Sequence, residues 1–271
     1  MKCQFFLVLF LLVLSPAVFG QFTGDSYKDA KIKGKVDSVI ETRYLIDNDT
    51  TDRSRFDRFV YIFNEKGRIV KSTEHSMNGY FTLITVYSYD DKGYIKEKRI
   101  DEKDKKVDTL SPVSITTFTY AANHQSVKAD RRQTSKNKPD FLTDFTVRID
   151  LDKSGKRLKD SSFYFGTSQI THRHNYRYNT KGVLVELRDA EGALGIIPSK
   201  TFFTYDDNGN LVKETRMSYR GYYNKPQALI KTYIRIYTYP KIDSKHNWLI
   251  KNEYFEGKLD RITERQITYY K

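Results

Sequence analysis

The stretch "THRHN" holds the residue types best suited to metal chemistry. His172 and His174 alternate along a predicted strand, so both side chains would point to one face. Two imidazoles could hold a metal ion if a carboxylate or a third histidine joined them. The chain has 5 histidines, and His75, His124 and His246 fall in or near other predicted turns. A pair of exposed surface histidines is the simpler interpretation, and we expect no metal site.

A second candidate for ion binding is "DDNGN", in which Asp206, Asn208 and Asn210 occupy alternate positions. A calcium loop would place its glycine later and would end on a bidentate glutamate. A β-turn accounts for the same residues without a metal. Carboxylates are plentiful, so a glycosidase-type pair stays open, although nothing in the sequence marks out two of them.

Signatures of catalysis are missing from the sequence. There is no Walker A loop, no G-x-G-x-x-G after a strand, no H-E-x-x-H and no G-x-S-x-G. The single cysteine, Cys3, lies within the first 20 residues, which we interpret below as a signal peptide, and this excludes thiolate chemistry and disulfides from the rest of the chain. We therefore expect a protein that is not an enzyme and uses no cofactor.

The segment "RMSYRGYYNKP" gives the best indication of binding. We predict that it forms a glycine- and proline-bearing loop. Its five candidate ligand-binding residues are Arg216, Tyr219, Arg220, Tyr222 and Tyr223. Exposed tyrosines can stack on sugar rings, and arginine can bind an acidic group. The alternative is that these rings cover the open end of a sheet and shield it from water.

The N-terminus is typical of a secretory signal peptide. Lys2, the apolar run Phe5–Leu14 and "SPAVFGQ" follow in the expected order, so we predict a signal over residues 1–20 and a mature chain over 21–271. The apolar run is too short to span a bilayer as a helix, and no later stretch is long and apolar enough. The mature chain is expected to be periplasmic or secreted.

The chain is basic, with a formal net charge of +13 and a pI near 9.5. This charge makes a carbohydrate or another anionic polymer a candidate partner. Lysine and arginine are interleaved with acidic residues, as in "IKEKRIDEKDKK", which is also typical of a solvated strand face. A nucleic-acid partner is not expected, since no concentrated basic stripe is visible.

A repeated hairpin pattern organises the chain. In "TYDDNGNL", two residues suited to a type I turn precede Gly209, which suits the left-handed position of a three-residue hairpin loop. The spacing pairs Tyr205 with Leu211 on one face of the sheet. The same spacing occurs around other glycines and is partly eroded around the last of them: Gly67, Gly93, Gly182 and Gly155.

The aromatic anchors recur about every 30 residues, which indicates a repeat architecture. More eroded copies contain "FTYAANHQS" and "YTYPKIDSKHNWL". The second is predicted to have a longer turn, with Trp248 in the core of the last hairpin. We predict an all-β fold of repeated antiparallel hairpins in a curved or partly rolled sheet, with its aromatic face inside. It forms a single domain over 21–271, with an irregular region at 100–140 that could divide it.

The motifs "YSYDDKGYI" and "FTYDDNGNL" resemble the YD repeats of the Rhs family. The closing "HNWLIKNEYFEGKLDRITERQITYY" resembles the ending of small secreted YD-repeat-like proteins of Bacteroidetes-type bacteria. The resemblance implies β-hairpin repeats and offers no catalytic motif. In large Rhs proteins such repeats build a shell around a toxin domain, and this chain is too short for a full shell.

These observations lead to three functional expectations. The first is a non-enzymatic secreted or periplasmic binding scaffold of the bacterial envelope, with a carbohydrate or acidic polymer as ligand. The alternative is a protein-interaction module, such as an immunity or accessory factor of an Rhs-like system. A hydrolase that uses a carboxylate site is the third and weakest.

Overall fold

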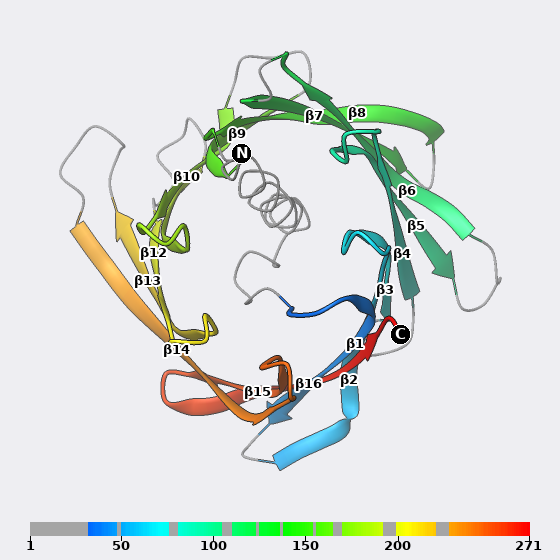
Figure 1. Cartoon of the computed structure of the whole chain (residues 1–271). Helices are drawn as coiled ribbons and strands as arrows, with labels where there is room; N and C mark the ends of the chain where they lie inside the picture. Colours follow the sequence, from blue (N-terminus) through cyan, green and yellow to red (C-terminus); the bar gives the residue numbers. More distant parts are fainter. Residues whose placement is uncertain are drawn as a thin grey trace, which may run out of the picture.

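The computed structural model describes residues 32–47, 50–75, 81–104, 110–122, 125–135, 138–153, 156–164, 170–191, 199–220 and 228–271. Within these ranges the chain forms strands that pair in sequence order, each antiparallel to the next, in one closed barrel (Figure 1). The predicted signal peptide, residues 1–20, lies outside the described residues. The all-β antiparallel fold expected from the sequence is therefore confirmed.

The strands run from 7 to 15 residues in length. The first eight are β1 (Val36–Asp47), β2 (Thr50–Phe63), β3 (Ile69–His75), β4 (Phe81–Tyr89), β5 (Ile95–Asp104), β6 (Leu110–Tyr120), β7 (Ser126–Ser135) and β8 (Lys138–Leu151). The others are β9 (Arg157–Tyr164), β10 (Ile170–Tyr178), β11 (Leu184–Glu191), β12 (Ser199–Tyr205), β13 (Leu211–Arg220), β14 (Ala228–Ile242), β15 (Trp248–Phe255) and β16 (Lys258–Tyr269). The ladder continues through β5 to β8, across the irregular region at 100–140.

The sheet is more closed than the curved or partly rolled sheet that we expected, because its first and last strands pair. The predicted opening and closing strands, β1 and β16, pair with each other from Val36 with Tyr269 to Leu45 with Arg261. This pairing satisfies the backbone N–H and C=O groups that the two edges of an open sheet would leave unpaired. Among the described residues, no helix is long and apolar enough to cross a membrane.

The predicted hairpin register is confirmed at four turns. Tyr205 pairs with Leu211 next to a bulge, and the Gly209 N–H donates to the Asp206 carbonyl at 3.0 Å. Gly209 has φ +85°, which is the left-handed conformation that the spacing predicted. The other three pairs are Phe63–Ile69, Tyr89–Ile95 and Tyr178–Leu184, around Gly67, Gly93 and Gly182, which also have positive φ. Gly155 lies outside the described residues.

The last hairpin was predicted with too long a turn. Its closing pair is Ile242 with Trp248, so the turn has the same length as the others. His246 occupies the position of the glycine, with φ 63°, and donates its N–H to the Asp243 carbonyl at 3.0 Å. The extra residues that misled the spacing are absorbed by bulges between Thr238 and Ile242 on β14.

Substitutions at Gly209 and His246 test whether both residues hold the left-handed position of their turns. Gly209→Ala is expected to lower the free energy of unfolding by about 1 kcal/mol, because a Cβ disfavours the left-handed conformation. No atom lies within 4 Å of that Cβ, so the cost is conformational and not steric. His246→Gly is expected to raise stability by about 0.5 kcal/mol. Urea unfolding measures both, and equal signs for the two variants would contradict the assignment.

Tyrosine hydroxyls join successive hairpins. Tyr89 donates to the Ile69 carbonyl at 2.5 Å, and Tyr178 to the Arg157 carbonyl at 2.9 Å. In each case the acceptor is the first residue of the second strand of the preceding hairpin. That residue pairs with the preceding hairpin's own anchor, as Ile69 pairs with Phe63 and Arg157 with Leu151. Tyr239 makes the same bond to Leu211 at 2.6 Å. These three anchors are tyrosines, because phenylalanine has no hydroxyl to make the hydrogen bond that joins the hairpin to the preceding one.

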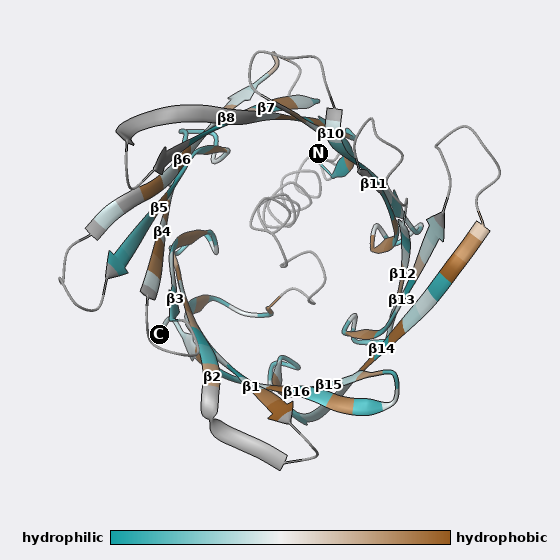
Figure 2. Ribbon diagram, turned by 180° about the vertical axis from the view of Figure 1, so that it is seen from behind, coloured by the Kyte–Doolittle hydropathy of each residue, from teal (hydrophilic) through white to brown (hydrophobic). Residues whose placement is uncertain are grey.

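The two faces of the sheet differ. We call the face that carries Val39, Tyr87, Val127, Ile149 and Phe203 the aromatic face, since the buried side chains are concentrated there. On the other, which we call the second face, exposed aliphatic and charged side chains prevail. Figure 2 shows apolar segments alternating with hydrophilic ones around the barrel, with an apolar stretch near the start of β14.

Candidate functional site

A pocket of about 430 Å³ lies over β13, β14 and β15. It is lined by side chains of the aromatic face: Glu214, Arg216, Ser218, Tyr233, Arg235 and Phe255. The register explains their convergence, because Glu214 is opposite Arg235, Arg216 is opposite Tyr233, and Arg235 is opposite Phe255. Alternate residues of three neighbouring strands thus point to one place.

Two near-parallel rings form the apolar part of the pocket. The centroids of Tyr233 and Phe255 are 6.1 Å apart, with an angle of 18° between the ring planes. The guanidinium carbon of Arg235 lies 5.2 Å from the Phe255 centroid, and the Lys231 ammonium lies 4.6 Å from the Tyr233 centroid. Both rings are half-buried, so part of each remains open to a ligand.

The charged side chains that line the pocket differ in whether they have a polar partner. Arg235 Nε lies 3.4 Å from a carboxylate oxygen of the buried Glu253. The buried Tyr237 hydroxyl donates to Glu214 at 3.2 Å, and burial and the Glu214 carboxylate raise the pKa of this tyrosine. Within the described parts of the chain, the exposed guanidinium of Arg216 forms no hydrogen bond or ion pair. Arg216 is therefore the cation that an anionic ligand would meet.

A guanidinium beside flat ring faces suits a ligand that has both an acidic group and an apolar ring face. Arginine binds carboxylate and sulfate oxygens with two parallel N–H groups. Aromatic rings stack on the faces of flat ligands. The pocket therefore has the chemistry to bind a sugar acid, and it does not need a metal ion or a cofactor to do so.

The structure separates the residues that the sequence placed in one loop. Residues 216–220 belong to strand β13, so the loop prediction was wrong for Arg216, Tyr219 and Arg220. Side chains alternate along a strand, and Arg216 therefore lies in the pocket whereas Tyr219 lies on the second face beside Met217, to whose Sδ it donates at 3.2 Å. The side chain of Arg220 and the whole of Tyr222 and Tyr223 lie outside the described residues.

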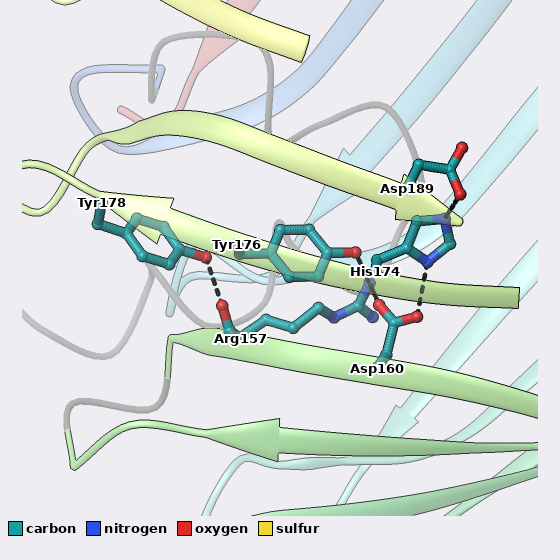
Figure 3. Close-up of polar contacts among 6 residues, drawn as sticks. All are labelled: Arg157, Asp160, His174, Tyr176, Tyr178 and Asp189. Carbon is teal, nitrogen blue, oxygen red and sulfur yellow. Dashed lines mark hydrogen bonds and ion pairs between the residues drawn. The ribbon is translucent and has the colours of Figure 1, made fainter. Parts of the chain in front are cut away.

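A buried polar cluster on β9, β10 and β11 is the second candidate site (Figure 3). Its centre is Asp160, which is 3% exposed. His174 Nδ1 lies 2.7 Å from Asp160 Oδ1, and the Tyr176 hydroxyl donates to Asp160 Oδ2 at 2.7 Å. Arg157 Nη1 donates to Asp160 Oδ2 at 3.2 Å and to the Tyr176 oxygen at 3.0 Å. On the other side of the imidazole, His174 Nε2 lies 3.3 Å from Asp189.

The pKa shifts of Asp160 and His174 favour the charged form of each side chain. Burial alone would raise the pKa of Asp160, but the hydrogen bond from His174 and the Arg157 guanidinium hold it below its usual value. Burial alone would lower the pKa of His174, but the hydrogen bond to Asp160 and the charges of Asp160 and Asp189 raise it. The cluster is thus an ion-pair network, because each charge stabilises its neighbour's charged form.

Comparisons with known proteins assign no family. No family model matches the chain, and no curated protein matches it. Among solved structures, a protein of unknown function from Bacteroides fragilis is 14% identical, with a TM-score of 0.30, over 57% of this chain and 93% of that one. A porin-like protein from Bacteroides uniformis is 9% identical, with a TM-score of 0.39, over 86% of this chain and 96% of that one.

A structure described as TcdB2-TccC3-TEV is 13% identical, with a TM-score of 0.32, over 83% of this chain. The match covers 11% of that chain, so this protein spans a small part of its length. With identities of 9% to 14% and TM-scores of 0.30 to 0.39, these structures assign neither a site nor a function to the chain.

The two histidines of "THRHN" have different surroundings. His174 belongs to the buried cluster, whereas His172 is exposed on the same strand. Among the described residues, no group of three or more histidine, cysteine or acidic side chains could hold a metal ion. Asp160, the partner that decides the role of His174, stands in "RLKDSS" with no spacing signal that links it to the histidine.

Most of the pocket could not be found from the sequence. Tyr233 and Arg235 lie in the strand sequence "IKTYIRIYTY", where they read as ordinary strand residues. Phe255 ends β15, and Glu214 stands next to the repeat turn of β13. The alternation of aromatic and charged residues on β14 was the available signal, but it did not say which neighbours would share the face.

Proposed function

We propose that this protein is a non-enzymatic carbohydrate-binding scaffold, exported to the bacterial envelope, whose pocket binds an acidic sugar. The observation that carries the proposal is the guanidinium of Arg216, which has no polar partner among the described residues and lies beside the rings of Tyr233 and Phe255. The basic balance of the chain and the predicted signal peptide favour an anionic ligand met outside the cytoplasm.

Repeat architecture supports the scaffold part of the proposal. We infer that the hairpins are of the YD-repeat type, because the turn glycines and the tyrosine hydroxyl bonds recur in several units. Repeated hairpins of this kind hold neighbouring strands at a fixed distance, so side chains from three strands keep their positions in the pocket without a ligand. Such preorganisation reduces the entropic cost of binding.

Two of the buried carboxylates, Asp160 and Glu186, lack the raised pKa of a general acid, which favours binding over hydrolysis. A general acid needs a raised pKa, whereas the pKa values of the buried Asp160 and Glu186 are lowered. Burial would raise both, but hydrogen bonds from His174 to Asp160 and from Arg188 to Glu186 outweigh it. In the pocket, Glu214 is hydrogen-bonded by Tyr237 and is part of the supporting structure.

Truncation of Arg216 tests the proposed function. Arg216→Ala is expected to weaken the binding of oligogalacturonate about tenfold, since a charge-assisted hydrogen bond contributes about 1.5 kcal/mol or more. Isothermal titration calorimetry at two salt concentrations measures the loss. Lys213→Ala is the matched control, because it removes one cation from the same strand on the opposite face. Equal losses in both variants, or no binding by the natural protein, would refute the proposal.

A second candidate function rests on a different observation. Exposed aliphatic side chains follow β14: Leu229, Ile230, Ile234, Ile236 and Ile242. Of these, Ile234 and Ile236 are neighbours on the second face, and exposed apolar side chains that lie together are typical of a surface that meets another protein. A protein-interaction module is therefore the alternative, and it would be preferred if the calorimetric experiment found no saccharide.

A further inference from the structure

Basic side chains gather on the second face of β7 to β12, which is the face opposite to the one that lines the pocket on β13 to β15. Two rows cross these strands. In the first, Lys128 is opposite Arg148, and Arg148 is linked through Ser161 to Arg173. In the second, Lys159 is linked through Asn175 to Arg188, and Arg188 is opposite Lys200. We call these six cations the basic band.

The spacing of the band follows from the geometry of the sheet. Neighbouring strands are about 4.8 Å apart. The backbone positions of cations on adjacent strands are therefore about 4.8 Å apart around the barrel, and those on alternate strands about 9.6 Å apart. Within a row, the cations therefore form a line perpendicular to the strands. Such a line matches a ligand whose negative charges repeat along an extended chain, rather than a single anion.

Acidic neighbours offset part of this charge. Lys128 pairs with Asp130 at 2.9 Å, and Arg188 pairs with the buried Glu186 at 2.6 Å. Lys159 lies opposite Asp150 in the register, but neither Lys159 nor Lys200 forms an ion pair among the described residues. The band thus keeps a surplus of positive charge. The Lys200 ammonium lies 5.2 Å from the Tyr219 centroid, and no carboxylate among the described residues neutralises it or the Lys159 ammonium.

Elsewhere on the second face, exposed or half-buried aliphatic side chains stand at Ile40, Ile62, Val86, Ile234 and Ile236, interspersed with cations such as Lys71, Arg99 and Lys213. In the band, the pairing of β7 to β12 brings together cations from six neighbouring strands, which no local sequence window contains.

The surroundings of the band favour a saccharide over a nucleic acid. Proteins that bind single-stranded nucleic acid offer exposed rings on which bases stack. On these strands the Arg148 guanidinium carbon lies 5.1 Å from the Phe163 centroid, so that a cation already covers the ring on which a base would stack. We propose that the basic band is a second binding site, which holds a linear, negatively charged polysaccharide across β7 to β12.

Removal of the ammonium groups of Lys159 and Lys200 tests whether the basic band binds a polyanion. The probes are dextran sulfate and neutral dextran, measured by biolayer interferometry at two salt concentrations. The double variant Lys159→Gln with Lys200→Gln is expected to weaken dextran sulfate binding about tenfold, since each contact contributes up to about 1 kcal/mol. The slope of log affinity against log salt is expected to fall by roughly 1.5 units, because fewer counterions are released.

The matched control is the double variant Lys66→Gln with Lys71→Gln, which removes the same charge from an exposed turn and strand outside the band. It is expected to change the affinity by less than about twofold. Equal losses in the two double variants would overturn the proposal, because net charge alone would then explain binding. Tighter binding of oligothymidylate than of dextran sulfate would make nucleic acid the occupant and would also overturn it.

The proposal for the pocket and the proposal for the basic band can be refuted independently. The band rests on different strands and on the opposite face from Arg216, so Arg216→Ala is expected to leave dextran sulfate binding within about twofold of the natural protein. If Arg216→Ala removes dextran sulfate binding and the double variant in the band does not, the pocket is the polyanion site and the band proposal is wrong.

Discussion

Asp160→Asn is expected to lower the free energy of unfolding by about 3 kcal/mol, since removing one partner of a buried ion pair leaves the other charges unpaired. The carboxylate is 3% exposed and is held by Arg157, His174 and Tyr176 at 3.2, 2.7 and 2.7 Å. Asparagine keeps the shape of the side chain but loses its charge, so the effect is electrostatic. Urea unfolding followed by circular dichroism measures it.

Asp189→Asn is the matched control. Asp189 contacts the same imidazole, His174, but at 3.3 Å, and its side chain is 24% exposed. Solvent screens this pair, and the expected loss is below about 1 kcal/mol. If the two variants were equally stable, the central role of Asp160 in the cluster would be refuted.

The pH dependence of stability has two parts with opposite signs. The pKa of Asp160 is lowered from 3.8, so its contribution is present above pH 3.8 and is lost as the pH falls through the lower, folded value. The pKa of His174 is raised from 6.5, so its contribution is present below pH 6.5 and is lost as the pH rises through the higher, folded value. Asp160→Asn is expected to flatten both sides of this profile.

Trp248→Ala is expected to destabilise the protein by about 4 kcal/mol, because it leaves a large cavity at the seam where the barrel closes. Trp248 is 1% exposed, and the Arg265 guanidinium carbon lies 3.4 Å from its ring centroid. Arg265 in turn donates to Glu41 with Nε at 3.1 Å and Nη2 at 2.5 Å. The ring therefore supports the ion pair that joins β16 to β1.

Trp248→Phe separates the two contributions of this side chain. Phenylalanine keeps a ring face for the guanidinium and fills most of the space, so we expect about half the loss. The chain has a single tryptophan, and both variants are therefore followed by circular dichroism instead of fluorescence. An alanine variant as stable as the phenylalanine variant would contradict the proposed role of the seam.

Local sequence was sufficient for the hairpins. The pairs Tyr205–Leu211 and Tyr178–Leu184 follow from the distance to Gly209 and Gly182, because a type I turn with a left-handed residue fixes the register of the strands beside it. The same rule failed at the last hairpin, where His246 holds the glycine position. A left-handed non-glycine residue, here His246 with φ 63°, gives no clear signal in a sequence.

The sequence by itself determined the all-β class, the register of four hairpins and the absence of familiar catalytic motifs. Only the tertiary structure decided that the sheet closes, that Arg216 faces Tyr233 and Phe255, and that Asp160 reaches His174. The reason is physical. A hairpin turn depends on residues within a few positions, whereas a face of a sheet is shared by residues whose neighbours are set by the pairing of whole strands, including β1 with β16.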